Sequence, residues 1–377
     1  MSNTMLENMT ILIDGKESFP EIIKCIDNAK NYIKINMFIW RDDRIGNQIA
    51  RAVLNAANRG VKIEISKDRY GLVLEKCEEN KKSFFHKKQT LIELLKIKTL
   101  EKFYPMDNTP KKGIEKYTGL YNGIIHHPNI TLKKDTFKAD HSKYYIIDDT
   151  LILGGINIED KENGSDRQGR EYQDYMIKLE GKDYVDSFLY KLRSGADIYN
   201  DYFFGINLKE KNSHKFEMEK LYLNMIKQAK SELKITMAYF SCLKPFIDEI
   251  VNAQKRGVNV TIMIPEHANF QDDTNKKTVK TLLKRTNNQI NVYFSPKMIH
   301  TKMIINDDYI SIGSTNITKK AFNQLDELNL FIKNINSEIK YKLDENIKEN
   351  YAKARKINDY KEIKYNKARS SIESLLI

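Results

Sequence analysis

The chain has 377 residues, of which 41% are hydrophobic and 30% are charged, so it is neither a disordered nor a collagen-like sequence. Its 63 lysines and arginines outnumber 51 aspartates and glutamates, which gives a net charge of +12 and favours an anionic partner. The charge alone does not distinguish nucleic acid from an anionic lipid surface, because both attract lysine and arginine in the same way.

The first residues, MSNTMLENMT, lack the basic and apolar regions of a secretory signal. No stretch of the sequence approaches the roughly 18 apolar residues of a membrane span. The three cysteines, Cys25, Cys77 and Cys242, are scattered and match no zinc or disulfide spacing, which is typical of a reducing compartment. We therefore expect a cytoplasmic protein that is either soluble or peripheral to a membrane.

Two segments near the N-terminus recur later in the chain. The sequence NAKNYIKINMFIW from Asn28 resembles QAKSELKITMAYF from Gln228, and NAANRGVKIEI from Asn55 resembles NAQKRGVNVTI from Asn252. Each copy predicts a helix, a short apolar strand, a second helix and another strand. This alternation indicates βαβ units and an α/β fold, in which a mixed sheet is covered by helices.

Each second helix is predicted to end at an Arg-Gly pair. Gly60 and Gly257 stand where a helix C-terminus favours the left-handed conformation that glycine adopts readily.

An insertion of about residues 70–129 separates the first repeated unit from the motif that follows. Within it a helical pattern of apolar residues is flanked by lysines: Leu91, Ile92, Leu94, Leu95, Ile97 and Leu100. One interpretation is a lid or a membrane-facing helix. The other is ordinary packing of an inserted helix.

The segment HSKYYIIDDTLILGGIN contains the pattern His-x-Lys-x4-Asp at His141, Lys143 and Asp148, and Asn157 follows it. Residues i and i+2 of a strand face the same way, so the imidazole and the ammonium are predicted to project together. This pair suits a phosphoryl group, because lysine neutralises its oxygens while histidine attacks phosphorus or donates a proton. Asn157 lies near the end of the returning strand, where its amide has the chemistry to donate to the same phosphate.

Asp148 lies at an odd number of residues from Lys143, at an Asp-Asp turn. It is predicted to point away from the imidazole, so an architectural role is favoured over orienting the histidine. A working histidine also needs a partner on its other ring nitrogen. The candidate in this half is Asp174, at the start of the next apolar strand, with Glu171 as the neighbouring acid that we reject.

The same pattern recurs in HTKMIINDDYISIGSTN, at His300, Lys302 and Asp307, with Asn316 at the matching position. Asp307 is predicted to be architectural for the same reason as its counterpart. The acidic candidate in this half is Glu327, and its neighbour Asp326 is rejected. Two intact motifs in register with a duplicated framework make chance a poor explanation, and they argue against a degenerate scaffold that only binds anionic surfaces.

Paired HxKxxxxD motifs followed by GG-x-N or GS-x-N resemble the phospholipase D superfamily. Within it, the segments ILIDGKESFPEIIKCIDNAK, GGINIED and HTKMIINDDYISIGSTN resemble the bacterial cardiolipin synthase group. The resemblance implies two tandem pseudo-symmetric α/β lobes, residues 1–196 and 197–377, with one active site at the lobe interface. The second lobe is predicted to end in a charged helical tail with a short apolar end.

The resemblance also implies a reaction without cofactor or metal. One histidine attacks a phosphodiester to form a phosphohistidine, and the other protonates the leaving alcohol and then deprotonates the incoming one. Carried over residue by residue, the catalytic set comprises His141, Lys143, Asn157, Asp174, His300, Lys302, Asn316 and Glu327, with Asp148 and Asp307 as the aspartates of the motifs. The resemblance favours His141 as the nucleophile.

The implied function is transfer of a phosphatidyl group to the glycerol hydroxyl of phosphatidylglycerol. The implied partner is therefore an anionic phospholipid at the inner face of the cell membrane, reached by peripheral docking. The alternative is a phosphodiesterase of phospholipase D type that hydrolyses phospholipid or nucleic acid, because the same constellation serves both reactions. The oligomeric state remains open.

Overall fold

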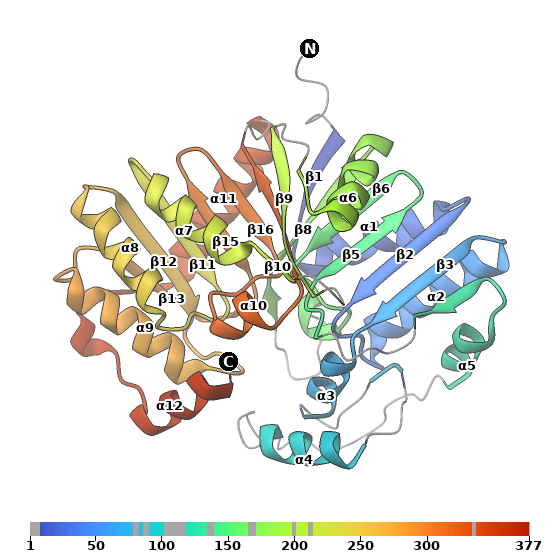
Figure 1. Ribbon diagram of the computed structural model, residues 1–377, viewed down its shortest axis with the longest axis horizontal. Helices are drawn as coiled ribbons and strands as arrows, with labels where there is room; N and C mark the ends of the chain where they lie inside the picture. Colours follow the sequence, from blue (N-terminus) through green and yellow to red (C-terminus); the bar gives the residue numbers. More distant parts are fainter. Residues whose placement is uncertain are drawn as a thin grey trace. The chain divides into compact units, whose positions relative to one another are not determined.

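A computed structural model of the chain describes residues 8–77, 83–85, 90–101, 118–133, 139–164, 171–197, 201–209, 214–333 and 337–376. It divides into two compact units (Figure 1). The N-terminal unit is Leu12–Asp186, and the C-terminal unit consists of Ser187–Ile377 with Met1–Ile11.

The N-terminal unit is built around a mixed sheet. Its elements are α1 (Asp14–Asn28), β2 (Tyr32–Met37), α2 (Arg44–Asn58), β3 (Lys62–Lys67), α3 (Arg69–Cys77), α4 (Leu91–Leu100), α5 (Thr118–His126), β4 (Ile130–Leu132), β5 (Lys143–Ile147), β6 (Thr150–Gly154), the 3-10 helix η4 (Asp160–Asn163), β7 (Tyr172–Gln173) and β8 (Tyr175–Glu180). Two further elements, β1 (Met9–Ile13) and α6 (Lys182–Ser194), each include residues of both units. The strands that lie wholly within the unit are arranged in the order β8–β6–β5–β2–β3–β4. Strands β2, β3 and β4 are parallel, whereas β5, β6 and β8 alternate in direction.

The C-terminal unit has a larger mixed sheet. Its elements are β9 (Tyr202–Lys209), β10 (His214–Phe216), α7 (Met218–Gln228), β11 (Glu232–Met237), α8 (Lys244–Lys255), β12 (Asn259–Pro265), α9 (Asp272–Arg285), β13 (Asn291–Ser295), β14 (Met298–Ile299), β15 (Lys302–Asn306), β16 (Ile310–Gly313), α10 (Lys319–Asn323), β17 (Glu327–Ile332), α11 (Ser337–Lys353), β18 (Arg355–Ile357), the 3-10 helix η5 (Tyr360–Glu362) and α12 (Lys367–Leu376). The strand order is β10–β9–β17–β16–β15–β11–β12–β13–β18.

The two sheets contain the same core of five strands. The order β8–β6–β5–β2–β3 in the first unit matches β17–β16–β15–β11–β12 in the second, with the same parallel pair at one end and the same antiparallel hairpin next to it. Gly60 and Gly257 end α2 and α8 with φ angles of 98° and 89°. The predicted duplication of an α/β unit with a mixed sheet is therefore confirmed.

Each unit has its own apolar core between sheet and helices. In α2, Ile45, Ile49 and Val53 recur every four residues, so they lie on one face of the helix and are buried. They pack in a cluster with Ile33 and Ile35 of β2. A separate cluster in the C-terminal unit joins side chains of α7, α8 and α9 to β11, β12 and β13.

The inserted helix α4 is apolar on two faces rather than along a single stripe. Ile97 and Leu100 are buried against α3, where they pack with Val73 and Cys77. Leu91, Ile92, Leu94 and Leu95 are exposed. At 100° per residue, Ile97 and Leu100 lie on the side of the helix opposite to Leu91 and Leu95.

The C-terminal tail is packed more extensively than its charge suggests. In α11, Ile339, Leu343 and Ile347 recur every four residues and are buried. Strand β18 pairs antiparallel with β13, and Ile357 joins the core of the unit. The tail is therefore part of the C-terminal unit, and one of its acids, Glu373 of α12, is itself buried and accepts hydrogen bonds from Thr274. Among the described residues, no helix combines the length and the apolar composition needed to cross a bilayer.

Candidate functional site

The predicted catalytic residues fall into two sets, one in each unit. The first motif comprises His141, Lys143, Asp148 and Asn157, and the second comprises His300, Lys302, Asp307 and Asn316. In both, the lysine begins a central strand, β5 or β15, and the histidine lies two residues before it. Each of the two sheets therefore presents its motif at the same place in the strand order.

The histidine and lysine of each motif are buried together. His141 and His300 are 7% and 6% exposed, and both lysines are fully buried. The Nζ of Lys143 donates to the carbonyl oxygen of His141 at 2.6 Å, and that of Lys302 donates to the carbonyl oxygen of His300. Each ammonium is thus bound to the main chain of the histidine that precedes it.

An aromatic ring packs on the first histidine. The rings of Phe38 and His141 meet edge to face with centroids 4.7 Å apart, and the Nζ of Lys143 lies 5.2 Å from the centroid of Phe38. Phe38 follows β2, and the matching residue after β11 is Ala238. This contact therefore has no aromatic counterpart at the matching position of the second motif.

Polar groups also flank His141 on both sides in the sequence. The side-chain amide of Asn36 donates to Asp140 and to Ser142, and the Ser142 hydroxyl donates to Asp140 at 2.5 Å. The backbone N–H of Asp140 donates to Asp68 at 2.9 Å. Burial raises the pKa of Asp68 to about 6. The loop that carries His141 is therefore fixed by Asn36 of β2, by Asp68 just after β3, and by its own flanking residues Asp140 and Ser142.

Asp148 binds the backbone of a distant segment. Its carboxylate accepts hydrogen bonds from the N–H groups of Lys30, Asn31 and Tyr32 at 2.7, 3.0 and 2.9 Å. Partial burial acts to raise the pKa of Asp148, but these bonds outweigh it and lower the pKa. Asp148 has a φ angle of 47° in the turn between β5 and β6. It ties this turn to the start of β2.

Asp307 makes the same connection in the second unit. Its carboxylate accepts hydrogen bonds from the backbone N–H groups of Lys230 and Ser231 and from the Ser231 hydroxyl. Partial burial acts to raise the pKa of Asp307, but the Ser231 hydroxyl and these N–H groups lower it to about 2. The geometry of both aspartates supports the predicted architectural role, with partners at or just before the start of the neighbouring strand rather than within the turn.

The two asparagines differ in what they bind. The side-chain oxygen of Asn316 accepts a hydrogen bond from the backbone N–H of Tyr239 at 3.2 Å, which leaves the amide NH2 as its donor end. The backbone N–H of Asn157 donates to Glu162 at 3.1 Å. Among the described residues, the buried side-chain oxygen of Asn157 has no hydrogen-bond partner.

Asp174 and Glu327 occupy equivalent places. Each lies two residues before the residue that pairs with the glycine of the preceding strand, which is Met176 in β8 and Asn329 in β17. Asp174 and Glu327 are each only 1% exposed.

Their contacts differ between the units. Glu327 accepts a hydrogen bond from the Ser314 hydroxyl, whereas Asp174 lies against Gly155, where a Cβ would come within 2.2 Å of its carboxylate. The shorter acid thus faces the residue without a side chain.

The rejected acids have other partners. Glu171 forms an ion pair with Lys16 at 2.7 Å, and Asp326 accepts a hydrogen bond from the backbone N–H of Lys209 at 2.8 Å. Glu171 and Asp326 therefore serve contacts outside the motifs.

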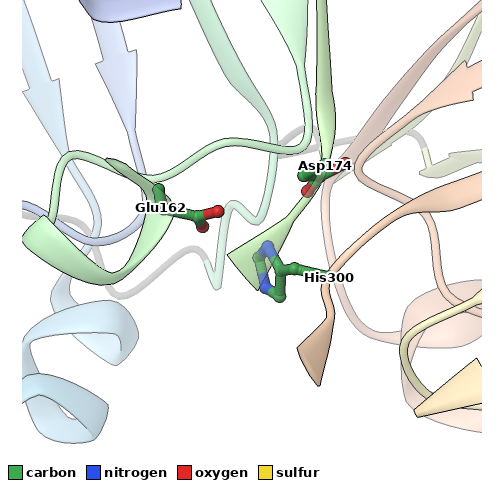
Figure 2. Close-up of side chains that lie close together, drawn as sticks. All are labelled: Glu162, Asp174 and His300. Atoms are coloured by element: carbon green, nitrogen blue, oxygen red, sulfur yellow. The ribbon is translucent and has the colours of Figure 1, made fainter. Parts of the chain in front are cut away.

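Glu162 is a further candidate that the sequence patterns do not reveal. It lies on η4 and is 1% exposed, and its carboxylate accepts from the backbone of Asn157. A carboxylate oxygen of Glu162 lies within 4.8 Å of a carboxylate oxygen of Asp174. Figure 2 shows both side chains. The residue at the matching position after Asn316 is Ala321, so a comparison of the repeats does not single out this position.

Comparison with known proteins agrees with these features. A family model described as "Cardiolipin synthase, PLD-like domain" matches residues 22–188 and 222–351. Cardiolipin synthase 2 of Staphylococcus epidermidis is 25% identical over 348 residues, which cover 86% of this chain and 64% of that protein. Cardiolipin synthase B of Escherichia coli K12 is 24% identical over 343 residues, covering 85% of this chain and 75% of that protein.

A solved structure shows the same fold. Phosphatidylserine synthase of Haemophilus influenzae Rd KW20 superposes with a TM-score of 0.68 at 13% identity, covering 99% of this chain and 92% of that one. The chain spans about two thirds of the length of the Staphylococcus relative, or 64%. With a family model matched across both units, each of which carries an intact motif, the chain belongs to the cardiolipin synthase-like, PLD-like domain family of the phospholipase D superfamily.

Proposed function

We propose that the chain is a phosphatidyltransferase of cardiolipin synthase type, which transfers a phosphatidyl group to the glycerol hydroxyl of phosphatidylglycerol. The observation that carries the proposal is the repeated arrangement of a buried histidine and lysine at the start of the central strands β5 and β15. The names of the relatives support the substrate class, and the family match supports the type of chemistry.

In the proposed reaction both histidines act on one phosphodiester. The His141 imidazole attacks phosphorus, the bond to the leaving alcohol breaks, and His300 gives that alcohol a proton. The phosphatidyl group is then bound to His141. In the second step His300 takes the proton from a hydroxyl of phosphatidylglycerol, whose oxygen attacks phosphorus and releases His141. When both lipids are phosphatidylglycerol, the products are cardiolipin and glycerol.

The remaining residues have supporting roles in this proposal. Lys143 and Lys302 neutralise the phosphate oxygens, and the amides of Asn157 and Asn316 donate hydrogen bonds to them.

Asp174 and Glu327 hold the histidines in the tautomer and orientation that the reaction needs. Asp148 and Asp307 maintain the strands and do not touch the substrate.

The contact with Phe38 supports His141 as the nucleophile. An aromatic ring packed edge to face against the imidazole restricts its rotation. This contact favours a fixed direction of attack for His141.

The test is incubation of the purified protein with phosphatidylglycerol vesicles and, separately, with single-stranded and double-stranded DNA. Mass spectrometry of the lipids is expected to show cardiolipin together with free glycerol. Phosphatidic acid without cardiolipin would instead identify hydrolysis, and nicked DNA would identify a nuclease.

Substitution of the histidines tests the mechanism. We expect His141→Ala and His300→Ala each to lower turnover by at least about a thousandfold, because each acts in both steps. His126→Ala provides a matched control, since His126 is exposed on α5 outside both motifs. Near-normal turnover in either motif variant would contradict the two-histidine mechanism.

A further inference from the structure

The outer face of α4 concentrates exposed apolar side chains. Eight large hydrophobic side chains are exposed within the described ranges, and four of them lie on this one helix: Leu91 at 85%, Ile92 at 69%, Leu94 at 44% and Leu95 at 68%. Figure 1 shows α4, in cyan, outside α3 at the periphery of the N-terminal unit. Adjacent exposed apolar residues of this kind mark a surface that binds another protein or a membrane.

The opposite face fixes the helix to the unit. Ile97 and Leu100 pack on α3, and Glu93 forms an ion pair with Arg69 of α3 through two contacts of 2.5 and 3.1 Å. Thr90 and Glu93 form a capping box at the N-terminus of α4. Because this inner face is fully engaged, the four apolar side chains are directed outward.

The exposed charged residues of α4 are all positive. Its one acidic residue, Glu93, is buried in the pair with Arg69, whose guanidinium lowers the pKa of Glu93 to about 2. The exposed charged residues of α4 are Lys96 and Lys98. Within Leu91–Leu100 the outer face therefore combines apolar and cationic groups, and the half-buried Glu101 follows as the C-cap residue of the helix.

This face is connected to the first motif through α3. Tyr70 of α3 lies 6.2 Å from Phe38, measured between ring centroids, and Phe38 packs on His141. Lys67, just before α3, donates a hydrogen bond to the carbonyl oxygen of Phe38 at 2.6 Å. Any external surface on which α4 docks is thereby held at a fixed position relative to His141.

We propose that the outer face of α4 docks on an anionic phospholipid bilayer. Its apolar side chains enter the headgroup region while Lys96 and Lys98 contact lipid phosphates, as in helices that lie in the membrane interface. The inference deepens the proposed function, on which it rests, because it assigns a surface through which a lipid-modifying enzyme reaches its substrate. The net charge of +12 complements the same bilayer.

The test measures vesicle binding separately from turnover. The purified chain is sedimented with phosphatidylcholine vesicles that contain about one third phosphatidylserine, an anionic lipid that is not the proposed substrate. We expect Leu91→Gln/Leu95→Gln to weaken binding at least about tenfold, because each leucine loses most of its favourable transfer into the interface. Ile372→Gln on α12 is the matched control, since Ile372 is 47% exposed on another helix, and it should bind as the unaltered chain does.

A second pair of variants tests the charge. Lys96→Glu/Lys98→Glu is expected to weaken binding to the anionic vesicles about tenfold or more and to reduce its dependence on salt. Unchanged Tm values would show that neither pair of substitutions disturbs the fold, as expected for side chains directed outward. Equal binding of all variants would overturn the proposal, as would a switch between dimer and monomer caused by the leucine substitutions.

Turnover separates this inference from the proposed function. On short-chain phosphatidylglycerol dissolved as monomers, Leu91→Gln/Leu95→Gln should keep the turnover of the unaltered chain, and on vesicles it should lose most of it. If no lipid is turned over but vesicle binding still depends on Leu91 and Leu95, the proposed function fails and the docking surface stands. If turnover on vesicles survives the substitutions, the docking surface fails and the proposed function stands.

Discussion

Replacing Asp148 by alanine separates an architectural from a chemical role for the aspartate of the motif. The carboxylate accepts three backbone N–H groups, from Lys30, Asn31 and Tyr32. A hydrogen bond of this kind contributes about 1 kcal/mol net where water can replace the acceptor, and Asp148 is partly exposed. The substitution should therefore destabilise the N-terminal unit by about 3 kcal/mol, which corresponds to a Tm lower by roughly 6–12 °C for a domain of this size.

The acid dependence of the loss follows from the lowered pKa of Asp148. A carboxyl group whose pKa is depressed in the folded state stabilises the fold above its unfolded pKa, near 3.9, and this contribution disappears as pH falls through the folded pKa. The difference between the unaltered chain and Asp148→Ala should thus be constant from about pH 5 to 8 and shrink below about pH 4.

The assay is chemical denaturation across this pH range, combined with turnover per folded molecule at a temperature where both proteins are folded. Asp149→Ala is the matched control, because Asp149 is the exposed neighbour in the same turn. We expect Asp148→Ala to keep turnover within about threefold of the unaltered chain while its stability falls. An unchanged Tm together with loss of turnover would refute the reasoning and place Asp148 in the chemistry.

Three further substitutions and one treatment test other parts of the structure. Glu93→Gln removes the ion pair with Arg69, so it should destabilise the packing of α4 by about 1 kcal/mol at pH 7. The pair contributes fully at this pH, because pH 7 lies above the unfolded pKa of Glu93. Limited proteolysis near α4 should therefore accelerate. Burial raises the pKa of Asp68 to about 6, so its contribution to stability is present below pH 4 and lost as pH rises toward 6; denaturation of Asp68→Asn should lack this decline. Gly155→Ala should lower kcat at least about tenfold without unfolding the chain, because the new Cβ displaces the Asp174 carboxylate, and an unchanged kcat would show that this position is not needed. A chelator should leave turnover unchanged, and a loss restored by a divalent metal would contradict the histidine mechanism.

The parts of the fold that were predictable are those with a local signal. The β-branched strands and the Arg-Gly helix ends repeat in sequence, so the βαβ units and the left-handed Gly60 and Gly257 follow from short segments. Composition and spacing give different predictions for the C-terminal tail. Its many charges suggest a solvated helix, whereas the four-residue spacing of Ile339, Leu343 and Ile347 indicates a buried helix face, as the structure shows.

Contacts between distant segments were not predictable. The parity of the strand indicated that Asp148 turns away from His141, yet nothing in the sequence identified the N–H groups more than a hundred residues earlier as its partners. Similarity between the repeats does not identify Glu162 either. The residue at the equivalent position of the other copy is Ala321, which has no carboxylate.

The two motifs share their framework and differ in the residues that surround the histidines and the predicted orienting acids. Asp148 and Asp307 make the same tie, whereas Phe38 has Ala238 as its counterpart and Gly155 has Ser314. In an assembly of two identical subunits every substitution appears in both copies at once. Because both motifs lie in one chain, a substitution beside one histidine leaves the sequence around the other unchanged, so the two histidines can have different neighbours.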